Sequence, residues 1–170
     1  MKSKRKTERM KIINAVVFSA LLLLVIYRAS QTATDVQPIT TDGFVRVNVS
    51  IEGTAMIFTG NCRQITMNVV DTQALSIING ILKRVDTRPL THDMMKDILD
   101  NFGIKVILAR VESFENEIYY AKTFLQQGNQ VLELDTRPSD AVGIAVRTDT
   151  PVYFKAVLLE TKGTNVCGNK

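Results

Sequence analysis

The sequence of 170 residues is poor in histidine, cysteine and proline, and each scarcity limits what the chain can be. His92 is the only histidine, so a zinc site with two histidines cannot form, and a Ser/His triad has little room. Only four prolines and 45% hydrophobic residues indicate an ordered domain with a real core. Two cysteines allow one disulfide outside the cytoplasm. The alternative, which we expect, is a buried Cys62 with a loose Cys167 near the C-terminus.

Basic residues are concentrated at the N-terminus. Residues 1–11 contain six lysines and arginines against one acidic residue, Glu8. From residue 29 onward there are 14 basic and 16 acidic side chains, a net charge of −2. The folded part is therefore slightly acidic and does not support a long surface that follows a nucleic-acid backbone. Any phosphate site in the domain must be local.

One long uncharged run, residues 12–27, follows the basic end. As a helix it would reach about 24 Å, somewhat short of a ~30 Å hydrocarbon core, and the flanking Tyr27 and Arg28 can sit at the interface. We predict a transmembrane anchor at residues 12–28, with residues 1–11 as a basic cytoplasmic tail and the domain outside. A cleaved signal peptide, which would make the protein secreted, and a buried core helix are the alternatives. Residues 29–43 read as a linker.

The remaining chain alternates between strand and helix patterns. Predicted strands are Phe44–Ile51, Ala55–Phe58, Gln64–Val70, Ile104–Glu112, Ile118–Leu125, Val131–Asp135 and Pro151–Phe154. Predicted helices are Thr72–Lys83, Thr91–Phe102 and Ser139–Arg147. Short connections favour antiparallel pairing, so the fold class is α+β: a mostly antiparallel sheet with about three packed helices in a single compact domain, residues 44–160. We expect residues 161–170 to form a flexible tail.

The motif Asp-Thr-Arg-Pro occurs twice, at residues 86–89 and 135–138, each time before a predicted helix. After each copy comes a hydroxyl residue that we expect to cap the helix, and then an acidic residue in its first turn. These residues are Thr91 with Asp93, and Ser139 with Asp140. Capping alone would explain this part of the pattern.

The arginine of each motif, Arg88 or Arg137, stands just outside a helix N-terminus. A guanidinium and free backbone N–H groups together could hold a phosphate there. The alternative is that each arginine pairs with a nearby aspartate and only fixes the turn. Local physics favours that alternative.

Aspartates around the only histidine suggest a cation site. Asp93 and Asp97 share a face of the helix that contains His92. Together with Asp135 and Asp140, they could bind Mg²⁺ or Mn²⁺ through oxygen atoms. Without a shared site, these carboxylates are capping and solubilising charges.

Two segments, Arg88-Pro89-Leu90-Thr91-His92-Asp93 and Leu134-Asp135-Thr136-Arg137-Pro138-Ser139-Asp140-Ala141, resemble the signature segments of the bifunctional nuclease domain family. Tyr120-Ala121, Ala145-Val146-Arg147 and Pro151-Val152-Tyr153 also fit the family pattern. The resemblance implies a compact α+β domain that hydrolyses both RNA and DNA. The residues at the matching positions are our candidates for the site, although the resemblance does not supply their catalytic roles. They are Arg88 and Arg137 for phosphate; His92, Asp93, Asp135, Ser139 and Asp140 for catalysis; and Asp93, Asp135 and Asp140 for metal.

One position departs from the family pattern, because the first helix usually opens with glutamate and alanine. Here the pair is Gln73-Ala74, and an amide cannot replace the charge or the proton chemistry of a carboxylate. We therefore expect a membrane-anchored nuclease acting on DNA, RNA or both with a divalent cation. The alternative is a non-catalytic ligand-binding or assembly domain displayed at the membrane. Assembly as a homo-oligomer is left open.

Overall fold

The computed structural model describes residues 11, 14–25 and 39–168. The chain divides into two compact units, Met1–Val36 and Gln37–Lys170. In the first unit, residues 14–25 are helical and their side chains are exposed. No helix among the described residues has both the length and the apolar character needed to cross a membrane. Most of the predicted basic tail and linker, and both ends of the predicted anchor, lie outside the described residues, so the anchor stays a prediction.

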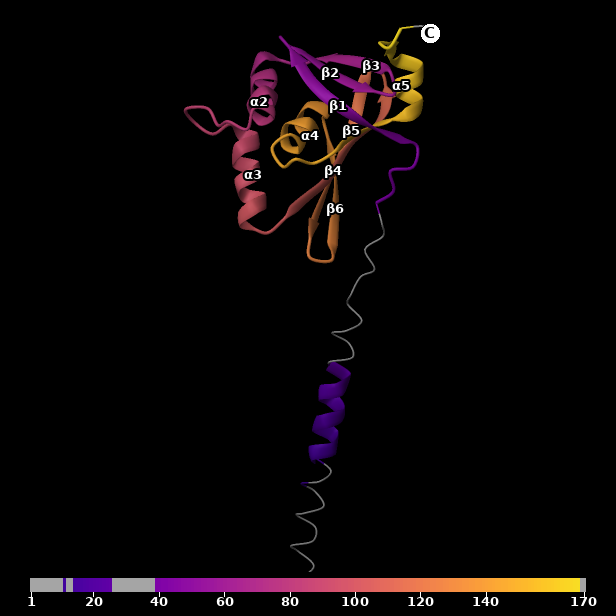
Figure 1. Ribbon diagram of the computed structural model, residues 1–170. Coiled ribbons are helices and arrows are strands. Elements are labelled where there is room, and N and C mark those ends of the chain that lie inside the picture. Colours follow the sequence, from indigo (N-terminus) through magenta and orange to yellow (C-terminus); the bar gives the residue numbers. More distant parts are fainter. Residues whose placement is uncertain (1–10, 12–13, 26–38, 169–170) are drawn as a thin grey trace, which may run out of the picture. The chain divides into compact units, whose positions relative to one another are not determined.

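The second unit is built on an eight-stranded sheet (Figure 1). Its strands are β1 Phe44–Glu52, β2 Ala55–Gly60, β3 Arg63–Asn68, β4 Lys105–Glu115, β5 Ile118–Gln127, β6 Gln130–Thr136, β7 Val152–Lys155 and β8 Thr164–Asn165. They lie in the order β6-β5-β4-β7-β1-β2-β3-β8. The paired neighbours are antiparallel except β4 and β7, which run parallel. The α+β class and the mostly antiparallel sheet are therefore confirmed.

Helix α4 lies at the centre of the helical layer. The helices of this unit are α2 Asp71–Ile81, α3 Thr91–Asn101, α4 Pro138–Ala145 and α5 Ala156–Lys162. Helix α4 packs on β4 and β5, and α2 and α3 pack on α4 (Figure 1). Helix α5 packs on β3 and β7. Because α4 touches the sheet, α2 and α3, six of its eight residues are buried.

Side-chain periodicity explains how these elements close a core. In β1, Val47 is buried while Arg46 and Asn48 are exposed, as expected for a strand with one face on the core. The central cluster includes the fully buried Phe58 and Phe154, whose ring centroids are 5.3 Å apart in an edge-to-face contact. Apolar faces of the helices complete this core and hold the helix entrances in fixed places.

The C-terminal segment corrects two expectations. It contains helix α5, which we did not predict from the sequence. The apolar run there follows β7 without a break and resembles a continued strand. The predicted flexible tail is wrong for the described residues up to 168, since β8 pairs with β3. A disulfide between Cys62 and Cys167, with their Cα atoms 5.2 Å apart, ties this segment to the turn after β2. The expectation of a buried Cys62 and a loose Cys167 is therefore also wrong, since Cys62 is exposed and bonded to Cys167.

Candidate active site

A pocket with a volume of about 520 Å³ opens where the N-termini of α3 and α4 meet α2, β5 and β6. We call it the helix-entrance pocket and define it by six of its lining residues: Gln73, Ser76, His92, Thr136, Arg137 and Asp140. Leu90 and Thr91 line it at the start of α3, and Arg137 lines it at the start of α4. Both predicted helix entrances therefore face one pocket.

His92 is held on two sides by side chains of other helices. Its Nδ1 atom lies 2.8 Å from Ser76 Oγ on α2, and its Nε2 atom lies 3.7 Å from Asp140 Oδ1 on α4. The ring also lies against Gly143 of α4, where a Cβ atom would come within 2.6 Å of Nε2. Only a residue without a side chain allows this contact. Packing thus fixes the ring in the pocket wall with 12% of the side chain exposed.

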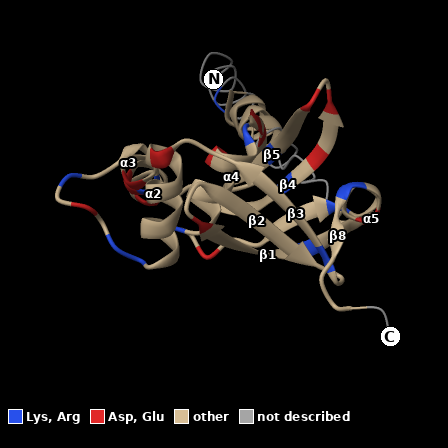
Figure 2. Ribbon diagram, turned by 90° about the horizontal axis from the view of Figure 1, so that it is seen from above, with Lys and Arg blue, Asp and Glu red and all other residues tan. Residues whose placement is uncertain are grey.

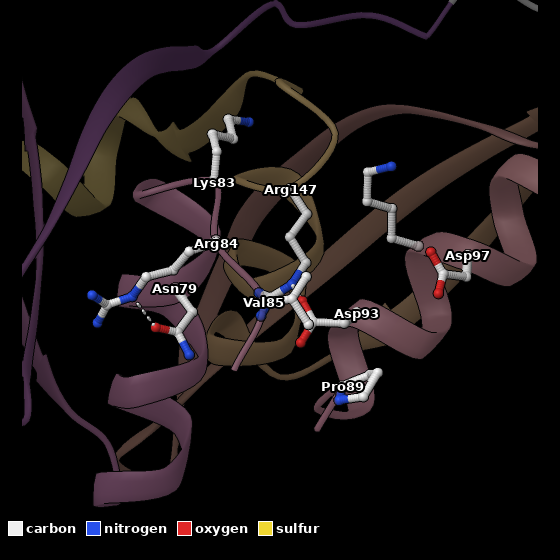
Figure 3. Close-up of a pocket in the computed structure, with 10 residues that line it drawn as sticks. Asn79, Lys83, Arg84, Val85, Pro89, Asp93, Asp97 and Arg147 are labelled. Atoms are coloured by element: carbon white, nitrogen blue, oxygen red, sulfur yellow. Dashed lines mark hydrogen bonds and ion pairs between the residues drawn. The ribbon is translucent and has the colours of Figure 1, made fainter. Parts of the chain in front are cut away.

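A buried ion pair supports the wall beneath His92. Arg147 Nε donates to Asp93 Oδ1 over 2.7 Å, and the two side chains are only 4% and 8% exposed. Arg147 also donates to the Gly143 carbonyl and to Ser76 Oγ, over 2.8 and 3.2 Å. The second Asp93 oxygen, Oδ2, accepts the Leu90 N–H at the start of α3. Asp93 is therefore fully engaged in holding α3 against α4 (Figure 3).

Burial and neighbouring charges determine the protonation of His92 and Asp93 in this pocket wall. Burial lowers the pKa of His92 below its ordinary value, and the nearby Arg147 charge adds to this against the opposing effect of Asp140. Burial alone would raise the pKa of Asp93, but hydrogen bonds from Arg147 and the Leu90 N–H bring it below its ordinary value. At neutral pH, His92 is therefore uncharged and Asp93 is ionised.

The two motif arginines have different surroundings. Arg137 donates to both oxygens of Asp140, over 2.6 and 3.1 Å, and its side chain stays 71% exposed. Arg137 thus makes the aspartate pair that the alternative expects, and its role toward phosphate stays a prediction. Arg88 is exposed in the loop between α2 and α3, which carries charges of both signs (Figure 2), and it does not line the helix-entrance pocket.

The predicted helix caps differ from those observed. Helix α3 begins at Thr91 and α4 begins at Pro138, so the cap positions belong to Leu90 and Arg137. Neither Thr91 nor Ser139 caps its helix through a hydroxyl group, because each already lies inside the first turn. Ser139 is buried in α4 and does not line the pocket.

Asp135 lies away from the other predicted site residues. Its neighbour Thr136 lines the helix-entrance pocket, whereas Asp135 lines a separate hollow with Glu112 and Lys122. Successive residues of a strand point to opposite faces, which accounts for the separation. The sequence motif places Asp135 close to the site along the chain but not in the pocket.

The predicted metal ligands do not form one donor set. Asp93 is taken up by Arg147, Asp135 lies in the separate hollow, and Asp140 binds Arg137. Across residues 11, 14–25 and 39–168, no group of three or more His, Cys, Asp or Glu side chains is arranged to hold a metal ion. The donor set therefore does not fit a cation held by the protein alone. Dependence on Mg²⁺ or Mn²⁺ stays a prediction.

A second pocket, of about 240 Å³, is also lined by the Asp93–Arg147 pair (Figure 3). Asp93 and Asp97 both line it, which confirms that they share a face of α3. Its basic side chains are already paired: Lys83 with Asp149, Arg84 with Asn79, Lys96 with Asp100, and Arg147 with Asp93. These pairs indicate a structural role for this region.

Three residues of the His92 environment were not predicted from the sequence: Ser76, Gly143 and Arg147. A signal for Ser76 existed, since it is a hydroxyl residue within the apolar period of a predicted helix. Such a buried hydroxyl needs a partner. Arg147 belonged to a recognised family segment, but nothing local indicated that it would pair with Asp93 from 54 positions away. Contacts of this kind depend on the packing of α3 against α4.

Comparison with known proteins gives this geometry a context. Residues 58–166 match the profile of a family described as "Bifunctional nuclease domain". Bifunctional nuclease 1 of Arabidopsis thaliana is 37% identical over 82 residues, which cover 46% of this chain and 25% of that protein. Bifunctional nuclease 1 of Oryza sativa subsp. indica is 26% identical over 101 residues, covering 58% of this chain and 30% of that protein.

A bacterial relative covers a similar part of the chain. An uncharacterised protein of Mycobacterium tuberculosis is 30% identical over 76 residues, which cover 45% of this chain and 44% of that protein. The chain thus spans about a quarter of the length of the Arabidopsis relative and under half of the mycobacterial one. The family profile, residues 58–166, covers every residue that defines the helix-entrance pocket.

Proposed function

The chain belongs to the bifunctional nuclease domain family, and on that premise we propose that it hydrolyses phosphodiester bonds of DNA, RNA or both in the helix-entrance pocket. One observation carries this proposal. His92 from the first signature segment and Arg137 and Asp140 from the second meet in a single pocket. If these residues only stabilised their own turns, we would not expect them to line the same open pocket.

Arg137 is the residue best placed to bind phosphate. Its guanidinium is exposed and stands where α4 begins. Water weakens an exposed ion pair, so a phosphate group can compete with Asp140 for this guanidinium. The positive end of the α4 dipole, at the same helix start, favours the same anion.

The chemistry of hydrolysis fits the polarity of the pocket. Attack of water on phosphorus places more negative charge on the phosphoryl oxygens, and fixed donors around them lower the barrier. Arg137 supplies a charged donor and His92 supplies a ring nitrogen on the same side of the pocket. Asp140 supplies a carboxylate to the pocket. This carboxylate can orient a water molecule or the guanidinium group of Arg137.

The proposal also includes display of the domain outside the membrane. It is supported by six basic residues before the uncharged run at residues 12–27. Protease added to intact cells should then digest the domain. Digestion only after lysis would reverse this orientation.

A second function, ligand binding or assembly without catalysis, is favoured by one observation. Gln73 lines the helix-entrance pocket at the position where family resemblance leads us to expect glutamate. An uncharged amide there can donate and accept hydrogen bonds but cannot act as a base. A pocket of this composition could bind a phosphate-bearing ligand and leave it intact.

A cleavage assay separates the two functions. Residues 37–170, which form the second compact unit, are incubated with labelled single-stranded DNA and RNA in the presence of Mg²⁺, Mn²⁺ or EDTA. We expect slow cleavage that EDTA abolishes. Binding without cleavage under every metal condition would reject the nuclease function, and the Gln73→Glu variant would then show whether a missing carboxylate is the cause.

A further inference from the structure

Ser76 lies between the Arg147 guanidinium, which can only donate hydrogen bonds, and a ring nitrogen of His92, which can donate or accept one. Its Oγ atom is 3.2 Å from Arg147 Nη2 and 2.8 Å from His92 Nδ1. A guanidinium has no acceptor, so the Ser76 oxygen must accept from Arg147. The Ser76 hydroxyl still has its own proton to donate. Among the described residues, the acceptor for this proton is His92 Nδ1.

The other side of the ring has the complementary arrangement. Nε2 faces the Asp140 carboxylate, an acceptor, at 3.7 Å. A neutral imidazole carries one proton, so a ring that accepts at Nδ1 carries that proton on Nε2. Both sides of His92 therefore favour the same tautomer. A flipped ring would place carbon atoms against Ser76 and Asp140 and would lose both contacts.

Packing keeps the ring in this orientation. A Cβ atom at Gly143 would lie 2.6, 2.7 and 2.8 Å from three atoms of the ring, so the imidazole rests directly on the backbone of α4. Burial and the charge of Arg147 lower the pKa of His92, which keeps the ring uncharged at neutral pH. Packing thus fixes the side chain in position, and its surroundings disfavour a positive charge on the ring.

We infer that Ser76, itself oriented by Arg147, is a positioning residue that holds His92 as the neutral tautomer with its proton on Nε2. His92 then presents a hydrogen-bond donor to the helix-entrance pocket. With Nε2 already protonated, it cannot take a proton from water through that atom. The consequence for catalysis rests on the proposed function: His92 donates to an oxygen of the phosphodiester, and the base lies elsewhere.

The single histidine makes the tautomer directly measurable. The full chain is labelled with ¹⁵N-histidine, and two-bond proton–nitrogen correlation spectra are recorded at neutral pH, so that every signal belongs to His92. We expect Nδ1 to resonate as an unprotonated nitrogen and Nε2 as a protonated one. A protonated Nδ1, a charged ring, or averaged signals from both tautomers would overturn the inference.

The Ser76→Ala variant tests the positioning role. Loss of the hydroxyl should shift both nitrogen signals toward an average of the two tautomers. Thr136→Val is the matched control, since this pocket hydroxyl bonds to Thr123 and the Ala121 carbonyl and should leave the His92 spectrum unchanged. An unchanged spectrum in Ser76→Ala would show that Ser76 does not set the tautomer.

These spectra do not depend on nuclease activity. If the wild-type chain shows the Nε2–H tautomer but cleaves no nucleic acid, the positioning inference stands and the proposed function fails. If the chain cleaves nucleic acid with its proton on Nδ1, the inference fails and the function stands.

Discussion

Gly143 and His92 are in direct contact: the imidazole of α3 occupies the space that any side chain on Gly143 of α4 would need. Gly143→Ala should therefore force the ring or the helix to move. Overpacking of this kind costs about 1–3 kcal/mol, which denaturant unfolding can measure.

A double mutant supplies the control for that contact. If the ring is the obstacle, His92→Ala should relieve much of the cost of Gly143→Ala, and the two effects should not add. Additive effects would mean that Gly143 matters for backbone reasons unrelated to His92.

The buried pair of Asp93 and Arg147 predicts a large loss of stability on breaking it. Asp93→Asn leaves the guanidinium buried without its counter-ion, and such changes cost about 3–5 kcal/mol. Unfolding of the variant in urea gives the value.

Asp97→Asn is the matched control, because Asp97 lies one turn further along α3 and is exposed. Its effect should stay within about 0.5 kcal/mol. Similar losses in the two variants would contradict the assignment of Asp93 as the aspartate that holds α3 to α4.

Local periodicity was sufficient to predict most of the fold. Strict alternation in β1 and three- and four-residue spacing in α2 reflect which face meets the core, so these elements could be read directly. Helix α5 was missed because four residues of strand run into an apolar helix without a turn residue. The Cys62–Cys167 bridge could not be predicted from two cysteines 105 residues apart.

The candidate site was predicted in part, for a related reason. His92, Arg137 and Asp140 stand at helix entrances that a repeated motif marks, and they do share a pocket. Asp93 was expected in catalysis, yet it forms a buried ion pair with Arg147, which lies in the turn just after α4. A sequence motif shows which residues are near the entrances but not which face a cavity.

The disulfide should contribute measurably to stability. Cys62–Cys167 closes a loop of about one hundred residues, and a link of that size removes much entropy from the unfolded chain. Reduction with dithiothreitol should lower the free energy of unfolding by about 2–5 kcal/mol. The double variant Cys62→Ser/Cys167→Ser should match the reduced protein and show no further response to dithiothreitol. Equal stability of the oxidised and reduced chains would contradict this role.

The two Asp-Thr-Arg-Pro motifs allow the proposed phosphate contact to be tested within one molecule. Arg137 lines the helix-entrance pocket, whereas Arg88 has the same local sequence but lies exposed in the α2–α3 loop outside it. Arg137→Ala should lower the rate of nucleic-acid cleavage roughly 100-fold or more, the usual loss for a contact to the developing charge. Arg88→Ala should leave the rate close to that of the wild type.

Stability distinguishes this effect from unfolding. The Arg137–Asp140 pair is exposed on the arginine side, so its loss should leave the stability close to that of the wild type and the variant should stay folded. Arg137→Lys keeps the charge but cannot make bidentate hydrogen bonds. Its cleavage rate should therefore lie between those of Arg137→Ala and the wild type. Equal losses in Arg88→Ala and Arg137→Ala would show that substrate contacts both helix entrances. Unchanged cleavage in Arg137→Ala would remove this residue from the phosphate site and leave it as a turn-fixing partner of Asp140.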